Sequence, residues 1–398
     1  MSREQLVEMA RRGIEHGKNN TQSQTDDVVR IPAKHYYDPE RWRLEVDRIF
    51  KRLPLMLGFS SELREPGSYR AVEVAGVPVL LARGDDGAIR AFVNTCSHRG
   101  AQLVDDGNGQ ITKFSCPYHG WVYNTSGDFV GMPDSRDFGA VDKACLSLTP
   151  LPVSERAGLI WVILTPGSTV DFDAFLKGYD EMLEHLGFAD SHVVGRQSLV
   201  GANWKVAYDG YLDFYHLPVL HAKSFGPDIS SKAVYTSWGP HQRVTGPDRH
   251  YDVLAALPED EWDESKLVGG VWTIFPHISI AAFDAGGKVY MVSQLFPGDT
   301  PDDSITVQNF VHTVAADEEQ AKLVADRMAF LMAVVADEDY YTGRRIQKAL
   351  KTGAKPEVLF GRNEGGGQRF HRWVQAFIDA PDDDALNLLL AEGIDANR

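Results

Sequence analysis

The sequence predicts an α+β protein in which a small antiparallel β-domain precedes a larger domain of helices and antiparallel strands. Between residues 67 and 164, short β-prone runs such as YRAVEVA and VPVLLAR are separated by turn residues, with little helical periodicity. Beyond residue 166, amphipathic stretches with helical spacing alternate with strand-like runs. A chain of 398 residues is long enough for two or three domains. We expect an N-terminal segment at 1–45 that packs on the last domain, the β-domain at 46–164 and the larger domain at 165–398.

Helical periodicity and strand-like runs place the individual elements. The predicted helices are 39–52, 171–186, 204–215 and 316–351, and the predicted strands lie within 271–297. The last of these helices is the longest, and its apolar stripe is predicted to lie in the core. The stripe consists of Leu323, Met328, Leu331, Met332 and Val335.

The charge balance excludes several classes of partner. The chain has 56 acidic and 40 basic side chains, a formal charge of −16, which argues against a surface that neutralises nucleic acid or an anionic bilayer. No apolar run approaches the roughly 18–20 residues needed to cross a membrane. The N-terminus lacks the apolar core of a secretory signal. We expect a cytoplasmic protein that binds neither nucleic acid nor membranes.

Two short motifs in the β-domain pair one cysteine with one histidine. They are Cys96-Ser-His98 and Cys116-Pro-Tyr-His119, and together they can bring two thiolates and two imidazoles to one point. Such a set suits either tetrahedral zinc or a [2Fe–2S] cluster in which two histidines replace two cysteines on one iron. Zinc sites more often use Cys–Cys and His–His pairs, so the spacing favours the cluster. The third cysteine, Cys145, is expected to be a small buried hydrophobe.

The runs CSHRGAQL and CPYHGWVYNTSGD resemble the signature of the Rieske non-haem iron oxygenases, specifically their ring-hydroxylating α-subunits. The resemblance implies that Cys96 and Cys116 bind one iron of a [2Fe–2S] cluster and that His98 and His119 bind the other. It also implies a Rieske domain joined to a helix-grip, or START-like, catalytic domain with an antiparallel sheet.

A second motif, in the larger domain, carries two further histidines. His216 and His221 are five residues apart with Pro218 between them, so the second histidine is expected where the helix breaks, facing the same point as the first. Two histidines and one carboxylate form a facial triad that leaves positions free on Fe(II). The segment resembles the mononuclear-iron motif of the same family. That resemblance implies that Asp213 hydrogen-bonds His216 and bridges to His119 of a neighbouring subunit. Asp209, one helical turn earlier, is the less favoured candidate for this role.

The carboxylate of the triad must come from another part of the chain. In the family it lies on a late helix, eight residues before a glutamine, a spacing that Asp339 and Gln347 match. Asp339 is therefore the predicted ligand, and Asp337 is the second choice. His371, in a segment that also resembles the family's C-terminal part, is expected to be a packed or surface histidine.

The resemblance implies the terminal oxygenase component of a multi-protein system. It would take electrons from a separate reductase, possibly through a ferredoxin, and use O2 to hydroxylate or dihydroxylate an aromatic or other apolar small molecule at Fe(II). Electron transfer between subunits implies a homo-oligomer, at minimum a trimer, and a β-subunit is possible. The alternatives are a demethylating monooxygenase acting on a quaternary ammonium or methoxy compound, a plain electron carrier, and a zinc-containing binding protein without catalysis.

Apolar side chains near the predicted iron are candidates for the substrate pocket. They are Val206, Leu212, Trp272, Ile274, Phe275, His277, Met332 and Val335. A carboxylated substrate would need an arginine or lysine in this pocket, and none can be placed there from the sequence.

Overall fold

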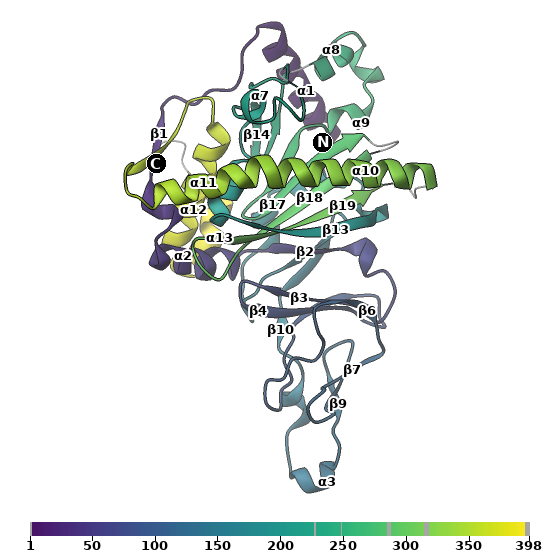
Figure 1. Cartoon of the computed structure of the whole chain (residues 1–398). Helices are drawn as coiled ribbons and strands as arrows, with labels where there is room; N and C mark the ends of the chain where they lie inside the picture. The colour runs from purple at the N-terminus through teal and green to yellow at the C-terminus, as the bar shows by residue number, and fades with distance from the viewer. Residues whose placement is uncertain (1, 227, 248, 285–287, 314–317, 395–398) are drawn as a thin grey trace.

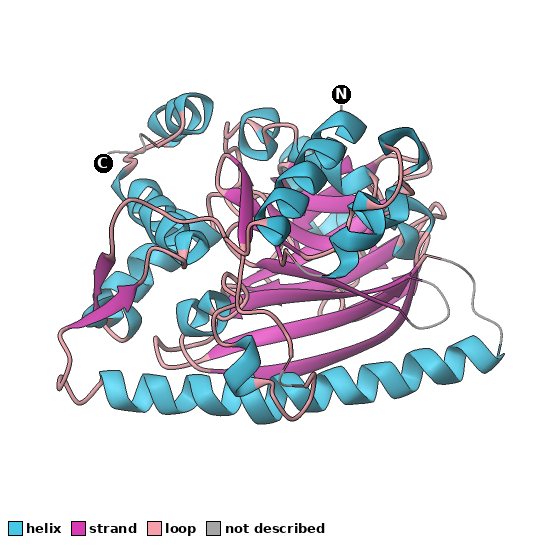
Figure 2. Ribbon diagram, turned by 90° about the horizontal axis from the view of Figure 1, so that it is seen from above, coloured by secondary structure: helices cyan, strands magenta, loops and turns pink. Residues whose placement is uncertain are grey.

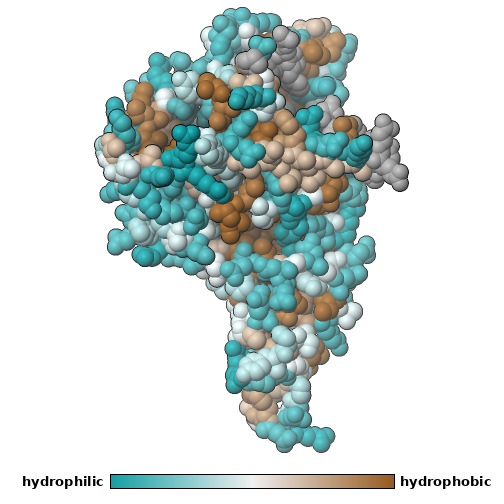
Figure 3. Space-filling view, in the orientation of Figure 1, coloured by the Kyte–Doolittle hydropathy of each residue, from teal (hydrophilic) through white to brown (hydrophobic). Residues whose placement is uncertain are grey.

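The protein consists of a broad upper body and a narrower lower lobe (Figure 1). The structure is a computed structural model that describes residues 2–226, 228–247, 249–284, 288–313 and 318–394. The first two residues of the helix predicted over 316–351 lie outside the described residues. The space-filling view shows hydrophobic side chains where the body narrows into the lobe, and others toward the tip of the lobe (Figure 3).

The lower lobe is built from short antiparallel strands, as the dense turn signals predict. Its strands form a five-stranded sheet in the order β10-β5-β4-β3-β6 and two three-stranded sheets, β11-β12-β2 and β7-β8-β9. They are β2 (Leu55–Phe59), β3 (Ser68–Val74), β4 (Val77–Arg83), β5 (Ile89–Val93), β6 (Gly107–Gln110), β7 (Lys113–Ser115), β8 (Val122–Asn124), β9 (Phe129–Gly131), β10 (Pro150–Leu151), β11 (Val153–Arg156) and β12 (Leu159–Val162). Strands β7 to β9 and the short helix α3 (Ser135–Phe138) form the tip.

The upper body is organised around a seven-stranded antiparallel sheet in the order β13-β19-β18-β17-β16-β15-β14. Its strands are β13 (His192–Gly201), β14 (Val234–Trp238), β15 (His241–Thr245), β16 (Val271–Ile274), β17 (Ile278–Asp284), β18 (Lys288–Pro297) and β19 (Ser304–His312). Sequence patterning predicts β16 to β18 but not the other four strands. In β13 exposed and half-buried residues alternate, and β15 and β19 carry many polar residues that the fold buries.

Helices cover both faces of this sheet (Figure 2). A long helix lies along one face and runs through α10 (Glu318–Val334), a π-helical turn η7 (Val335–Tyr340) and α11 (Tyr341–Leu350). The remaining helices are α1 (Ser2–Lys18), α2 (Pro39–Glu45), α4 (Phe172–Leu176), α5 (Tyr179–Glu184), α6 (Trp204–Asp209), α7 (Leu217–Leu220), α8 (Arg249–Ala255), α9 (Glu264–Leu267), α12 (Gly365–Asp379) and α13 (Asp383–Glu392). No described helix is both long and apolar enough to span a bilayer.

Two predicted helices are shorter than the sequence pattern suggested. The helix expected over 171–186 is divided into α4 and α5, because Lys177 and Gly178 both have left-handed backbone conformations. The helix expected over 204–215 ends at Asp209. In the long helix, Leu331 and Val335 are buried as expected, but Leu323 is 45% exposed and is not part of the core.

One continuous hydrophobic core joins the lower lobe to the face of the large sheet opposite the long helix. Strand β1 (Val29–Pro32) pairs with β20 (Glu357–Phe360), which ties the N-terminal segment to the end of the chain. A buried ion pair between Glu45 and Lys205 joins α2 to α6, and Trp204 donates its indole N–H to the same carboxylate at 2.9 Å. These contacts hold α6, which leads into the second histidine motif, in a fixed place.

Candidate metal centres

The two Cys–His motifs of the lower lobe form two loops with matching backbone geometry. In the first, the amide of Gly100 donates to the carbonyl of Cys96, and in the second the amide of Gly120 donates to the carbonyl of Cys116, both at 3.0 Å. Both glycines have left-handed φ angles, +77° and +69°, which residues with a Cβ rarely adopt. Each loop therefore turns back tightly over five residues and directs its cysteine and histidine side chains to one side.

The histidine side chains of the two loops contact each other, and so do the two cysteine side chains. The rings of His98 and His119 are 4.6 Å apart, and His98 stacks on Trp121 at 4.8 Å. Cys96 and Cys116 are buried, free and close enough to perturb each other. Burial, together with the neighbouring Cys116, raises the pKa of the Cys96 thiol.

This arrangement fits a [2Fe–2S] cluster with mixed ligands. His98 Nδ1 is buried and has no hydrogen-bond partner, an unusual state for a ring nitrogen unless it binds something else. Both thiols are buried, and iron bound between them would supply the positive charge that stabilises buried thiolates. Tyr123 OH lies 3.3 Å from Cys96 Sγ and accepts from the amide of Ser97 at 3.0 Å. The expectation for Cys145 is wrong, because this cysteine is exposed in the loop before β10.

The second histidine motif surrounds helix α7, which is a single turn. Pro218 lies at the start of this turn, where its missing amide costs nothing. His216 is the residue that caps the N-terminus of α7, and His221 caps its C-terminus. The proline therefore separates the two histidines onto the ends of one short turn, and their rings are 5.2 Å apart.

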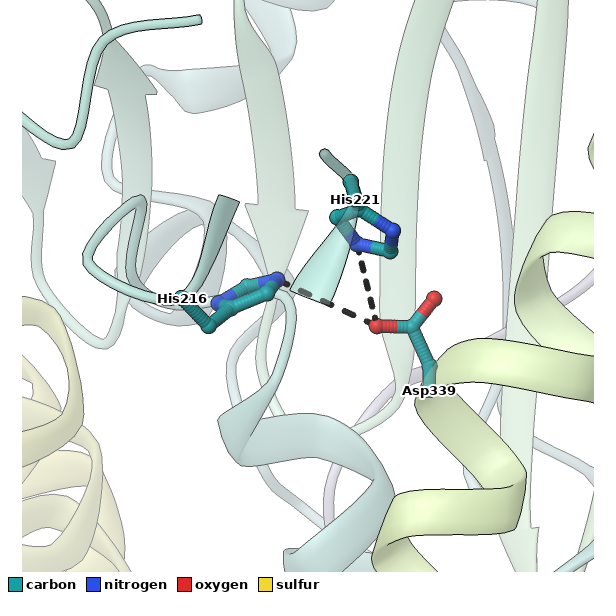
Figure 4. A group of neighbouring side chains, drawn as sticks. All are labelled: His216, His221 and Asp339. Carbon is teal, nitrogen blue, oxygen red and sulfur yellow. Dashed lines mark ion pairs between the residues drawn. The ribbon is translucent and has the colours of Figure 1, made fainter. Parts of the chain in front are cut away.

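The late helix brings a carboxylate to these two histidines (Figure 4). Asp339 Oδ1 lies 3.3 Å from His221 Nε2 and 3.8 Å from His216 Nε2. The possible ligand atoms of the three residues all lie within 4.8 Å of one another, a group that could hold a metal ion. Asp337, the second choice, is exposed and lies outside this group.

A second carboxylate lies behind each imidazole. Asp213 Oδ1 is 3.0 Å from His216 Nδ1 and also accepts from the backbone amide of His216. Glu338 Oε2 is 2.6 Å from His221 Nδ1. Burial lowers the pKa of His221, but hydrogen bonds to Asp339 and Glu338 outweigh it, so the net pKa is raised. A site with this much negative charge around two imidazoles fits a divalent cation, which would occupy the side where the Nε2 atoms and Asp339 face one another.

A cavity of about 360 Å³ extends from this group between the sheet and the long helix. Val206 and Val335 line it, as predicted, and so do all three residues of the group. Most of the other apolar residues that line the cavity were not predicted from the sequence; they include Phe214, Leu217, Leu220, Phe225, Val271, Phe283, Met291, Leu331 and Val334. They come from several distant segments, so no local pattern could have indicated them.

Six residues predicted to line the pocket lie elsewhere. They are Leu212, Trp272, Ile274, Phe275, His277 and Met332. Side chains alternate between the two faces of a strand, so Val271 faces the cavity whereas Trp272 and Ile274 join the core on the opposite face. Leu212 and Phe275 belong to that same core, and His277 hydrogen-bonds Met56 O at 3.2 Å. Met332 packs beside the cavity-facing residues of α10 without reaching the cavity.

Asp209 belongs to a buried polar network rather than to the metal group. It accepts from Tyr36 OH at 2.8 Å and lies 3.0 Å from His371 Nε2, which is also 3.0 Å from Tyr36 OH. His371 is 5% exposed, so it is a packed histidine. Gln347 donates to Tyr36 O at 3.0 Å, and so connects this network to the long helix.

Comparison with known proteins places both regions in described families. Residues 54–148 match the Rieske [2Fe-2S] domain, and residues 179–380 match the catalytic domain of the ring-hydroxylating alpha subunit. Among curated proteins, the glycine betaine monooxygenase oxygenase subunit of Chromohalobacter salexigens is 32% identical over 60% of this chain and 51% of its own length. The benzene 1,2-dioxygenase subunit alpha of Pseudomonas putida is 31% identical over 53% of this chain and 52% of its own length. The chain thus spans about half the length of these curated relatives.

Solved structures show that the fold is shared along nearly the whole chain. The quaternary ammonium Rieske monooxygenase CntA superposes with a TM-score of 0.74 at 22% identity, covering 89% of this chain and 96% of its own. Naphthalene 1,2-dioxygenase from Rhodococcus sp. gives a TM-score of 0.74 at 21% identity, covering 96% and 100%. Because the ring-hydroxylating alpha subunit model matches half of the chain and the Rieske model matches the lower lobe, the chain belongs to the ring-hydroxylating α-subunit family of Rieske non-haem iron oxygenases.

Proposed function

We propose that this protein is a terminal oxygenase that uses electrons from a separate reductase or ferredoxin, and O2, to hydroxylate an apolar small molecule. One observation carries the proposal. His216, His221 and Asp339 converge at the wall of an apolar cavity, in a chain that also holds two Cys–His loops. The first group suits a mononuclear Fe(II) with free positions, and the second suits a [2Fe–2S] cluster that stores one electron.

The chain's own residues supply positioning and exclusion of water. Fe(II) bound by His216, His221 and Asp339 would supply the activation of O2. Asp213 accepts a hydrogen bond from Nδ1–H of His216, which leaves the lone pair of that ring on Nε2, facing Asp339. The apolar walls hold a substrate carbon next to the metal site and keep bulk water from it.

Electrons would pass between two copies of the chain. Within one copy the tip strands β7 to β9 lie far from α7 (Figure 1). His119 is exposed beside Tyr118, which is 58% exposed, and Asp213 is partly exposed behind His216. A second copy's His119 could therefore contact Asp213, as the family resemblance implies. A closed ring of such contacts requires a homo-oligomer, and we propose a trimer.

The cavity favours an uncharged apolar substrate, such as an aromatic ring. Among the described residues that line it there is no lysine or arginine, so a substrate carboxylate would be buried without a cationic partner. Its charged side chains other than the histidines are acidic, and Glu364 is one of them. Burial, and then repulsion from Asp213 and Asp209, raises the pKa of Glu364. The acidic lining keeps a demethylating monooxygenase acting on a quaternary ammonium cation as the second candidate.

A product screen tests this proposal. The purified protein, supplied with a surrogate reductase, NADH and ¹⁸O2, is given three ring compounds of similar shape: toluene, benzyltrimethylammonium and benzoate. We expect ¹⁸O in a product of toluene, little or no turnover of benzoate, and formaldehyde only if the ammonium compound is demethylated. Oxidation of benzoate alone would contradict the substrate class. A colourless zinc protein without oxygenation of any compound would contradict the function.

The same preparation tests the assembly proposal. Free cysteines are usual in the reducing cytoplasm, where we place this protein. Native mass spectrometry is expected to give a mass of three chains. A larger mass with a second polypeptide would identify a β-subunit.

A further inference from the structure

We propose that Glu338 is a positioning residue that fixes the orientation and tautomer of His221, so that Nε2 of this imidazole is presented to the metal. The inference rests on the iron site of the proposed function. It adds a residue that does not itself bind the metal and whose role could not be assigned from the sequence.

The contacts of Glu338 place it directly behind His221. Its Oε2 lies 2.6 Å from His221 Nδ1, while Nε2 of the same ring lies 3.3 Å from Asp339 Oδ1. A carboxylate at Nδ1 stabilises the tautomer that carries the proton there, and this leaves the lone pair on Nε2. The His221 side chain is 4% exposed, so water does not compete effectively for either nitrogen.

Glu338 is itself held by a second hydrogen bond. Ser224 Oγ donates to the same oxygen, Oε2, at 2.9 Å, and the amide of Ser224 donates to the carbonyl of His221. The carboxylate is therefore fixed by two residues of one turn. This clamp joins the segment after α7 to the long helix, although the two are more than a hundred residues apart in sequence.

The local helix geometry explains how two consecutive residues can serve one ring. Glu338 and Asp339 both lie in the π-helical turn η7. In a regular α-helix, consecutive side chains diverge by about 100°. A π-helical turn is wider, so consecutive side chains diverge less, and such turns occur frequently at functional sites. Here Glu338 reaches Nδ1 and Asp339 reaches Nε2 of the same imidazole.

Each imidazole of the group thus has its own carboxylate partner, but the two carboxylates come from different parts of the chain. Asp213 contacts His216 from three residues earlier in the same loop, so the geometry of this pair is set by the local backbone. Glu338 serves His221 from another element. We infer that Glu338 couples the position of the long helix to the geometry of the metal site.

The test measures metal affinity and geometry rather than turnover. Mononuclear Fe(II) is removed from the holoprotein, and its rebinding is followed by competition with ferrozine, in wild type and in Glu338→Ala, Glu338→Gln, Ser224→Ala and Asp337→Ala. Urea denaturation followed by circular dichroism reports folding of the upper body in every sample, and the visible spectrum reports the [2Fe–2S] cluster. The electron paramagnetic resonance signal of the Fe(II) site with nitric oxide as probe reports its ligand geometry.

We expect Glu338→Ala to weaken Fe(II) binding about 10- to 100-fold and to change the rhombicity of the nitric oxide signal. Glu338→Gln keeps an acceptor and should recover much of this loss, and Ser224→Ala should show a smaller loss in the same direction. Asp337→Ala alters the exposed neighbour in the same turn and should match wild type. If Glu338→Ala fails to fold, Fe(II) rebinding by Glu338→Gln and Ser224→Ala tests the inference instead.

Wild-type affinity and an unchanged nitric oxide signal in Glu338→Ala would overturn this inference alone. The same holds if Asp337→Ala causes an equal loss, because the effect would then be one of general charge. Absence of Fe(II) binding in the wild type would instead overturn the proposed function.

Discussion

The two candidate metal centres are built in different ways. The cysteine and histidine ligands of the lower lobe come from residues 96–119, on two tight loops with the same backbone hydrogen bond and the same left-handed glycine. The mononuclear group combines the two ends of helix α7 with Asp339, which lies more than a hundred residues later on the long helix. One centre is therefore fixed by local backbone, and the other depends on how the long helix packs against the sheet.

This difference indicates which changes each centre should tolerate. Changes in the packing of the upper body should disturb the mononuclear group while the cluster loops remain intact. Changes in the loops should remove the cluster without moving α7. The following experiments test that separation, from the largest expected effect to the smallest.

Removing one ligand from either centre should prevent metal binding at that centre and leave the other centre occupied. Asp339→Ala should lose the mononuclear iron and lower turnover at least about a hundredfold, with an unchanged cluster spectrum. Cys116→Ala should lose the cluster colour and still bind Fe(II) at His216 and His221. Metal analysis and visible spectra of the two variants check this. Loss of both metals in either variant would show that the centres are not independent.

Breaking the buried ion pair under α6 should destabilise the upper body. Lys205 and Glu45 are both fully buried, and Lys205→Met leaves Glu45 with Arg41 as its remaining ion-pair partner. We expect a loss of about 3 kcal/mol in the free energy of unfolding, measured by urea denaturation. Lys51→Met, at the exposed pair with Asp47, is the matched control and should cost less than about 0.5 kcal/mol. Equal effects of the two substitutions would argue against a special role for the buried pair.

Acid should weaken the upper body through a buried neutral histidine. His241 accepts from the amide of Phe275 and donates to Phe175 O, and burial lowers its pKa to about 3. Below pH 6.5 the unfolded chain binds this proton and the folded chain does not, so stability falls as pH falls from about 6.5 toward 3. Between pH 6.5 and 5 this histidine alone should contribute a loss of about 1.5 kcal/mol.

The variant His241→Gln removes that titration. Its unfolding free energy should depend less on pH over the same range than that of wild type. His192→Gln, at the exposed first residue of β13, should keep the wild-type slope. An unchanged slope in His241→Gln would assign the acid sensitivity to other groups.

Within the lower lobe, a small change beside Cys96 should alter the cluster potential. Tyr123 OH is within hydrogen-bond distance of Cys96 Sγ, and a bond donated to sulfur stabilises the more negative, reduced cluster. Tyr123→Phe should therefore lower the potential by roughly 40 mV, the equivalent of about 1 kcal/mol for one electron. Redox titration of the cluster absorbance measures this. Tyr118→Phe, at the exposed tyrosine beside His119, should leave the potential unchanged, and a raised potential in Tyr123→Phe would contradict the assignment.

The same contrast explains what could be predicted from the sequence. The Cys–His loops could be found because each is a short motif, and Pro218 could be interpreted because its effect on a helix is local. The identity of the cavity walls could not, because the choice between Val271 and Trp272 depends on which face of β16 meets the long helix. The role of Glu338 could not be told from that of Asp337, because its contact with His221 depends on how the long helix packs beside α7. Likewise β15 and β19 carry polar residues that become buried only within the complete sheet.

The most direct test of two iron centres in one chain is a count of iron and acid-labile sulfide in the purified protein. We predict about three irons and two sulfides per chain for wild type, with the red-brown absorption of a Rieske cluster. His216→Ala should retain that colour and both sulfides and contain about two irons. Zinc as the main metal, or an iron count that His216→Ala leaves unchanged, would contradict the account.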